Sequence, residues 1–214
     1  MGWRLANACR LAVAGIVFLA ACSAQPSHAP GQSAIDVVHA WIDARNREDI
    51  EAVLALLSPT ANVLGFAMQV PSRREALVAA LEGQAVADWR INDTDCVFEG
   101  GVVTCAYSQD DAILRRWGLS FSGMHTYAVE KGLITRVARA HDLDSRDAGY
   151  AALRAFKDWV RDTHPDLIFV IWSDPTAATY ATPAGAMAAL HLLEEYEDFR
   201  ARPSQSVDAE ASSS

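Results

Sequence analysis

One short stretch, Asp95 to Tyr107, constrains the fold of this 214-residue chain more than any other. It reads Asp-Cys-Val-Phe-Glu-Gly-Gly-Val-Val-Thr-Cys-Ala-Tyr, two β-prone runs on either side of a glycine pair. Gly100 and Gly101 can both adopt the positive φ angles of a two-residue turn. The sequence therefore predicts a β-hairpin here.

This turn also predicts the register of the hairpin, which places Cys96 opposite Cys105. In that register the two cysteines form a non-hydrogen-bonded pair, and the short Cα separation of such pairs suits a disulfide. The alternative is a pair of small buried thiols, which we would expect in a cytosolic protein. The N-terminal sequence favours the disulfide, because it predicts export.

Residues 1–21 are predicted to be a lipoprotein signal peptide. Arg4 and Arg10 lead into an apolar run that ends in Leu19-Ala20-Ala21-Cys22, the order of an export signal. These last four residues resemble the lipobox of bacterial lipoproteins, which implies that Cys22 carries lipid. An ordinary signal peptide or an uncleaved anchor is the alternative, although the apolar run is short for a transmembrane helix.

The predicted lipid determines where the protein should lie. Three acyl chains hold a protein on a bilayer almost irreversibly, so the membrane is an expected partner. Ser23, and not an aspartate, follows Cys22; by resemblance to Gram-negative lipoproteins, this implies the periplasmic face of the outer membrane. A Gram-positive source would imply the cell surface. Residues 22–33, rich in Ser, Pro, Gly and Gln, are predicted to be a flexible tether.

Charge excludes two classes of partner. Loss of the signal peptide leaves 16 basic against 27 acidic residues and moves the formal net charge from −9 to −11. A chain of this charge repels nucleic acid and anionic lipid headgroups.

The cysteine count excludes catalysis by a free thiol. Cys9 is predicted to leave with the signal peptide and Cys22 to carry lipid, while the other two cysteines are predicted to pair.

Helices are predicted first and strands afterwards. Apolar residues recur at helical spacing from Ala34, and Ser72 to Glu75 forms a capping box at the start of a second helical region. Asp93 to Asp95 breaks the alternation of the first long strand, which predicts a β-bulge. A short strand is predicted at Asn62 to Phe66. Four longer ones follow: Val86 to Phe98, Val102 to Ser108, Trp117 to Val129 and Leu133 to His141.

Two of these segments resemble a known superfamily. The helical stretch Val38 to Pro59, VHAWIDARNREDIEAVLALLSP, is similar to the opening of nuclear-transport-factor-two-like, or SnoaL-like, domains. Tyr127 to Val137, YAVEKGLITRV, is similar to their closing hairpin. The resemblance covers residues 34–144 and implies an α+β fold, in which a cone-shaped, curved antiparallel sheet wraps the N-terminal helices and encloses an apolar pocket. It also implies that the open sheet face can form a homodimer.

Residues 145–201 are predicted to be a mainly helical extension that packs against the cone, over its mouth. Asp147 to Asp162 has helical periodicity, and Thr182-Pro183 combines an N-cap with a first-turn proline. The apolar run Leu167 to Trp172 is predicted to be a buried strand. Residues 202–214 are predicted to be a disordered tail.

The resemblance implies where a catalytic base would stand. Enzymes of this superfamily, such as ketosteroid isomerase and the polyketide cyclases, place an aspartate or a histidine inside the cone, where burial raises the pKa of a carboxylate. His125 and Asp88 are the candidates here. Asp88 and Arg90 share a strand face, so they form either a pair in the pocket or a surface ion pair. His125 alternates with Tyr127; a hydrogen-bonded core histidine is the alternative to a proton carrier.

The predicted ligand-binding residues are Trp41, Arg90, Tyr107 and Tyr127, because core and pocket lining coincide in a hollow cone. His141, Asp142 and Asp144 are ligand-type residues close together, but a metal site needs further ligands at compatible geometry. We therefore predict no metal site, and we expect no cofactor.

We expect from the sequence a lipid-anchored envelope protein that binds a small apolar ligand or an envelope partner without catalysis. The alternative is an isomerase, hydratase or cyclase that uses His125 or Asp88 as general base.

Overall fold

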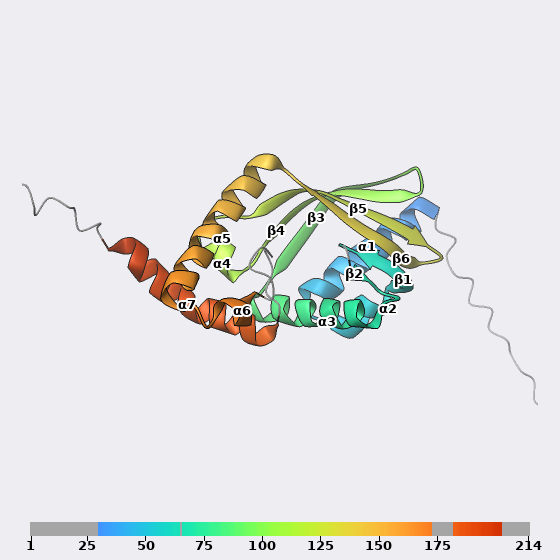
Figure 1. The fold of residues 1–214 in the computed structure, drawn as a ribbon. Coiled ribbons are helices and arrows are strands. Elements are labelled where there is room, and N and C mark those ends of the chain that lie inside the picture. The colour runs from blue at the N-terminus through green and yellow to red at the C-terminus, as the bar shows by residue number, and fades with distance from the viewer. Residues whose placement is uncertain (1–29, 65, 173–181, 203–214) are drawn as a thin grey trace, which may run out of the picture.

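The computed structural model describes residues 30–64, 66–172 and 182–202. The predicted signal peptide, with Cys22 and most of the tether, lies outside these residues, as does all but the first residue of the predicted tail. Pro30 to Ser33, predicted as tether, belong to the first helix. The helices are α1 Pro30–Asn46, α2 Ile50–Ala55, α3 Pro71–Val86, α4 Ala112–Arg116, α5 Leu143–Thr163, α6 Ile168–Ile171 and α7 Pro183–Ala201 (Figure 1).

The strands form one six-stranded sheet in the order β2-β1-β6-β5-β4-β3. Their bounds are β1 Leu57–Val63, β2 Phe66–Ala67, β3 Arg90–Glu99, β4 Val102–Asp110, β5 Phe121–Glu130 and β6 Leu133–His141. All neighbouring strands are antiparallel except β1 and β6, which run parallel. The fold class is the predicted α+β, with one parallel pair that makes the sheet mixed.

The hairpin of β3 and β4 has the predicted register. Glu99 pairs with Val102 and Val97 with Thr104, around Gly100 and Gly101 at φ 58° and 86°. The second tight turn has the same form, because Lys131 and Gly132 adopt φ 51° and 78° between β5 and β6. Both turns therefore follow from residues that tolerate a positive φ.

The predicted bulge is also present. The pairing of β3 with β4 shifts by one residue between Thr94 and Val97, and Asp95 adopts φ 50°. Asp95 and Cys96 together lie opposite Cys105, so the bulge reverses which residues of β3 point into the cone. The sulfur atoms of Cys96 and Cys105 lie 2.08 Å apart and the Cα atoms 4.1 Å apart, a geometry that admits the predicted disulfide.

The core of the cone lies between α1 and the concave face of the sheet (Figure 1). Val38, Trp41, Ile42 and Ala44 are buried, at the spacing of one helix face. Across from them Val103, Cys105 and Tyr127 are buried from the central strands β4 and β5. The long helix thus fills the curve of the sheet, as the resemblance implied.

The structure corrects two predictions around α3. This helix begins at Pro71 after the N-cap residue Val70, with no side-chain cap, so Ser72 lies inside the first turn and forms no capping box. The helix continues past Gly83 to Val86, where a strand was predicted. Apolar residues at 77, 81 and 85 extend the helical period across the glycine, and β3 begins only at Arg90.

The extension has a core of its own. Phe156, Trp159 and Val160 of α5 pack with Leu192 and Tyr196 of α7. Thr182 accepts a hydrogen bond from the amide of Gly185 at 3.1 Å, which confirms the predicted N-cap. The apolar run before it forms α6 and not the predicted strand, because Ile168 and Ile171 are buried at helical spacing while the residues between them are exposed.

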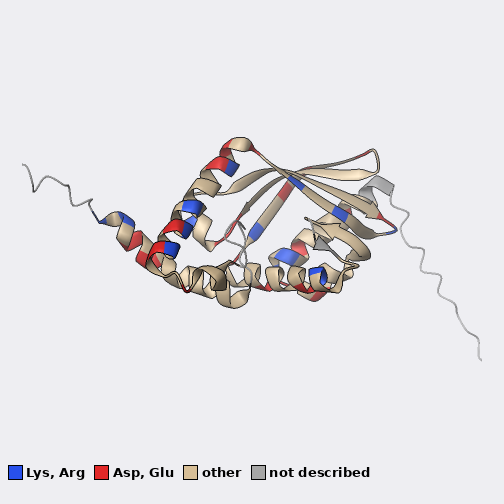
Figure 2. Ribbon diagram, in the orientation of Figure 1, with Lys and Arg blue, Asp and Glu red and all other residues tan. Residues whose placement is uncertain are grey.

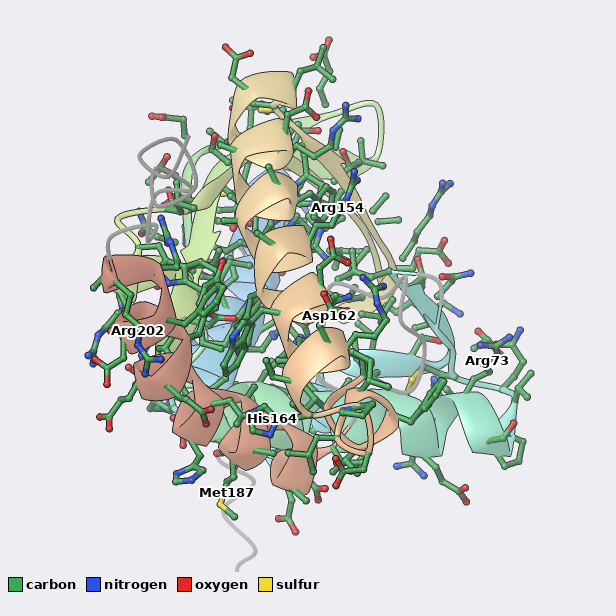
Figure 3. The ribbon with its side chains drawn as sticks, turned by 60° about the vertical axis from the view of Figure 1, so that its left-hand side comes forward. Arg73, Arg154, Asp162, His164, Met187 and Arg202 are labelled. Carbon is green, nitrogen blue, oxygen red and sulfur yellow. A yellow bond between two sulfur atoms is a disulfide. The ribbon has the colours of Figure 1, made fainter. Side chains whose placement is uncertain are left out.

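The outer surface of the extension carries both charged and apolar side chains. Acidic and basic residues alternate along α5 (Figure 2), and its Arg154 and Asp162 are exposed, as is Met187 of α7 (Figure 3). Within the described residues, no helix is long and apolar enough to cross a membrane.

Candidate functional site

Three side chains from β3 and β5 meet inside the cone. Nδ1 of His125 lies 3.0 Å and 3.1 Å from the two carboxylate oxygens of Asp93. The Tyr127 hydroxyl donates to Oδ2 of Asp93 at 2.6 Å. Because the carboxylate accepts these hydrogen bonds, the contact assigns the imidazole proton to Nδ1 and leaves Nε2 as the nitrogen that can accept a proton.

This group is closed off from water. The side chains of His125 and Asp93 are 2% and 0% exposed, and Tyr127 is fully buried. Burial lowers the pKa of His125, against the hydrogen bond and charge of Asp93, which raise it. Burial likewise raises the pKa of Tyr127 well above its ordinary value. At neutral pH the histidine is uncharged and the tyrosine keeps its proton.

Tyr107 connects this group to His141, the last residue of β6. Its ring stacks on His125, with centroids 4.0 Å apart, and its hydroxyl forms a hydrogen bond with Nδ1 of His141. Burial raises the pKa of Tyr107 to about 12 and lowers that of His141 to about 4. Around pH 7 the side chains of His125, Tyr127, Tyr107 and His141 are therefore all uncharged.

Arg45, near the end of α1, brings a cation into the interior. Its guanidinium lies 4.8 Å from the ring centroid of Trp41 and 4.2 Å from that of Trp89, and Nη2 donates to Oε1 of Gln84 at 2.6 Å. Burial lowers the pKa of Arg45 to about 10, so it remains charged at neutral pH. Two aromatic faces stabilise that charge without neutralising it.

Arg139 of β6 is the second interior cation. It stands opposite His125 in the pairing of β5 with β6, and Nη1 donates to Oε1 of Gln109 at 2.7 Å. Burial is the main cause that lowers its pKa.

A cavity of about 150 Å³ lies between the helices and the sheet. Its lining is mostly aliphatic, with Trp41, Arg45, Gln84 and Arg139 as the side chains that carry nitrogen or oxygen. The other residues that line it are Val53, Leu57, Val63, Leu64, Leu77, Ala80 and Leu81. A small, mostly apolar space with a few convergent polar groups is typical of a binding site for a small molecule.

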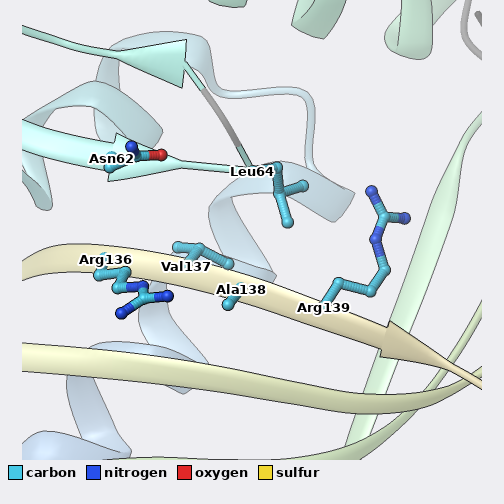
Figure 4. Close-up of a pocket in the computed structure, with 6 residues that line it drawn as sticks. All are labelled: Asn62, Leu64, Arg136, Val137, Ala138 and Arg139. Carbon is cyan, nitrogen blue, oxygen red and sulfur yellow. The ribbon is translucent and has the colours of Figure 1, made fainter.

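The extension covers the mouth of the cone. A second cavity of about 60 Å³ is lined by Arg139 and His141 of the sheet and by Tyr150 and Leu153 of α5. On the other side of Arg139 an open groove of about 590 Å³ runs along β6 and the end of β1 (Figure 4). Arg139 lines all three spaces, so the cavity adjoins the mouth and the groove at this side chain.

The structure contradicts the pocket position predicted for Asp88 and Arg90. The two form an ion pair with half-exposed side chains, and Asp88 also pairs with Arg115. Asp88 lies in the turn after α3, where it adopts φ 49°, and not on a strand. The alternation of inward and outward side chains along a strand therefore does not apply to it. The surface ion pair is the correct alternative, and neither residue lines the cavity.

The remaining predicted site residues lie inside. His125, Tyr127 and Tyr107 are all buried, as their alternation predicted, and Trp41 lines the cavity. Ligand binding or catalysis by any of them stays a prediction.

Sequence reasoning missed Asp93, Arg45 and Arg139. The signal for Asp93 was present: it has the parity of Trp89 and Ile91, which point inwards before the bulge.

Within the described residues, no group of three or more His, Cys, Asp or Glu side chains could hold a metal ion. His141 and Asp142 are turned to other partners, because Asp142 accepts a hydrogen bond from the Ser122 hydroxyl at 2.8 Å.

Residues 38–137 match the family model of the SnoaL-like domain. The chain therefore carries a SnoaL-like domain. The matched residues run from α1 to β6, so this domain contains Asp93, His125 and the two interior arginines. A search of the curated proteins found no match.

Several solved structures are similar to about half of this chain. An NTF2-like protein of unknown function from Cytophaga hutchinsonii is 18% identical and covers 53% of this chain and 94% of its own, with a TM-score of 0.39. A candidate polyketide cyclase from Xanthomonas campestris pv. campestris is 26% identical, covering 55% and 96%, with a TM-score of 0.39. The epoxide hydrolase/cyclase-like enzyme SalBIII is 14% identical, covering 53% and 94%, with a TM-score of 0.43.

Proposed function

We propose that this protein binds a small, largely apolar molecule inside its SnoaL-like cone, without catalysing a reaction, while a lipid on Cys22 holds it in the cell envelope. The observation that carries the proposal is the cavity of about 150 Å³ beside Trp41. A cavity of this volume with an apolar lining accepts a molecule about the size of benzene.

The residues around His125 support binding over catalysis. His125 does not line the cavity; its ring is packed against Tyr107, and its Nδ1 is held by Asp93. A general base must come within hydrogen-bond reach of the proton that it removes. In this arrangement the histidine is a hydrogen-bonded part of the core behind the cavity wall.

Filling the cavity tests the proposal. We expect small aromatic and aliphatic compounds to raise the Tm of the protein in a thermal-shift screen, because they bind only the folded state. Ala80→Phe places a ring in the cavity and should abolish these shifts. Ala155→Phe, at an exposed position of α5, is the matched control and should keep them. A screen in which no compound binds saturably would overturn the proposal.

The second candidate function is an isomerase, hydratase or cyclase with His125 as general base. The contact between Asp93 and His125 favours it, because a carboxylate on Nδ1 orients the ring and makes Nε2 a better base. Each compound found in the screen would be incubated with the protein and analysed by mass spectrometry. Recovery of every compound unchanged supports pure binding. If a compound is converted, and the rate of conversion falls at least 100-fold in His125→Ala while the compound still binds, the result supports a catalytic function.

A further inference from the structure

The polar groups that line the cavity are nearly all donors. Arg45 and Arg139 present guanidinium groups, and Trp41 presents an indole N–H. The amide oxygen of Gln84 is the exception, and it already accepts the hydrogen bond from Arg45. A ligand that enters this cavity therefore meets groups that bind acceptor atoms.

One of these donors has no partner. Trp41 is 1% exposed, and its Nε1 forms no hydrogen bond within the described part of the chain. A buried N–H without an acceptor costs free energy, about 1–3 kcal/mol in typical cases. A ligand with an acceptor atom near Trp41 would recover it.

The two arginines of the cavity are the second observation. Neither Arg45 nor Arg139 forms an ion pair with a described residue; each donates to a neutral glutamine instead. The carboxylate of Asp93 is held by His125 and Tyr127, and that of the buried Asp111 accepts a hydrogen bond from the amide of Leu114. Charges inside a protein are normally paired, so an anion in the cavity would supply a partner for both guanidinium groups.

We propose that the cavity binds a small apolar molecule that bears a carboxylate, with Arg45 and Arg139 as its charge partners and Nε1 of Trp41 as a further donor. This inference rests on the proposed function and names its ligand class. The aliphatic lining takes the apolar part of the molecule, and the two arginines, from α1 and β6, take the anionic end. Arginine suits this task because its planar fork matches a carboxylate.

The test compares two probes of nearly equal shape that differ in charge. Benzoate and benzamide would be titrated into the purified full chain by isothermal titration calorimetry. We expect benzoate to bind at least tenfold more tightly than benzamide. In Arg139→Gln and in Arg45→Gln the preference should fall below threefold.

Further variants distinguish the carboxylate inference from the more general proposal that the cavity binds a small molecule. Arg161→Gln removes the same charge from an exposed ion pair with Asp158, and should keep the tenfold preference. Arg139→Lys keeps the cation, and should retain part of the preference. If benzamide binds as well as benzoate and Ala80→Phe blocks both, the carboxylate inference is wrong and the cavity proposal stands. If neither probe binds while other compounds still raise the Tm, the carboxylate inference is wrong and the cavity proposal stands.

Discussion

Asp93 is the single residue on which the interior of the cone most depends. Its carboxylate accepts hydrogen bonds from both His125 and Tyr127, and its charge acts on Arg45, whose guanidinium forms no ion pair with a described residue. Since its side chain is fully buried, any change to it acts on polar groups that water cannot reach.

We expect Asp93→Asn to lower the free energy of unfolding by about 1–3 kcal/mol, because it weakens two buried hydrogen bonds. The pKa of His125 should fall further, since Asp93 raises it by hydrogen bond and charge. Urea unfolding and an NMR titration of the histidine would measure both effects. Asp95→Asn is the control, because Asp95 is exposed and asparagine tolerates its positive φ. Equal effects of the two substitutions would contradict the role given to Asp93.

The buried histidines predict how stability depends on pH. In the folded state the pKa of His125 is lowered and that of His141 is about 4, whereas both titrate near 6.5 in the unfolded chain. Below pH 6.5 the unfolded state therefore binds more protons, and stability falls as the pH falls. We expect Tm to drop by roughly 3 °C or more between pH 7.5 and pH 5.

Histidine variants would assign this pH dependence. In the double variant His125→Gln/His141→Gln the drop in Tm from pH 7.5 to pH 5 should be smaller than in the unaltered protein, as measured by calorimetry at each pH. His191→Gln, at an exposed position, should leave the drop unchanged. The same drop in all three proteins would show that other groups cause it.

Among the elements, the hairpin of β3 and β4 organises the site. Its bulge places Asp95 and Cys96 opposite Cys105, which turns Asp93 inwards on one side of the bulge and Cys96 inwards on the other. The sulfur atoms of the two cysteines lie 2.08 Å apart at this point, a distance that admits a disulfide. A bridge there would hold the bulge and, through it, the position of Asp93.

We therefore expect the Cys96→Ser/Cys105→Ser variant to lose about 2.5 kcal/mol of stability in urea unfolding, the entropy of closing a loop of this length. A reductant should destabilise the unaltered protein by a similar amount and leave the double variant unchanged. The opposite result, no effect of reductant on protein isolated from the envelope, would show that the cysteines are thiols there.

At the scale of the whole molecule, the extension converts an open cone into a covered one. Tyr150 and Leu153 of α5 close the mouth cavity beside His141 and Arg139, while α7 packs along the end of α3 through Gly83, whose Cα faces the carbonyl of Thr182. Arg139 lines the inner cavity, the mouth cavity and the groove along β6.

The place of the molecule in the cell gives the last prediction. Cys22→Ser should move the protein from the membrane fraction to the soluble periplasmic fraction, because attached acyl chains are needed to hold it on the bilayer. Immunoblots of fractionated cells would measure this. Cys9→Ser removes a cysteine that receives no lipid, and should leave the protein in the membrane fraction. Retention of Cys22→Ser in that fraction would contradict the lipid anchor.

The amino-acid sequence by itself determined the local features of this protein. Gly100-Gly101 and Lys131-Gly132 specify two tight turns, and alternation with one break specifies the register, the bulge and the strand face that His125 and Tyr127 share. These features depend on backbone angles and on a period of two, which neighbouring residues determine. Two predictions from local patterns were wrong: the predicted end of α3 was too early, and α6 was predicted to be a strand. Short apolar runs are compatible with either a helix or a strand.

Only the tertiary structure decided the composition of the site. Arg45, Asp93 and Arg139 come from α1, β3 and β6, and no local pattern connects residues so far apart in the chain. The curvature of the sheet around α1 brings them within reach of one cavity, and side chains of the extension line the mouth of the cone. Burial then gives their charges and hydrogen bonds the strength that an exposed cluster would lack.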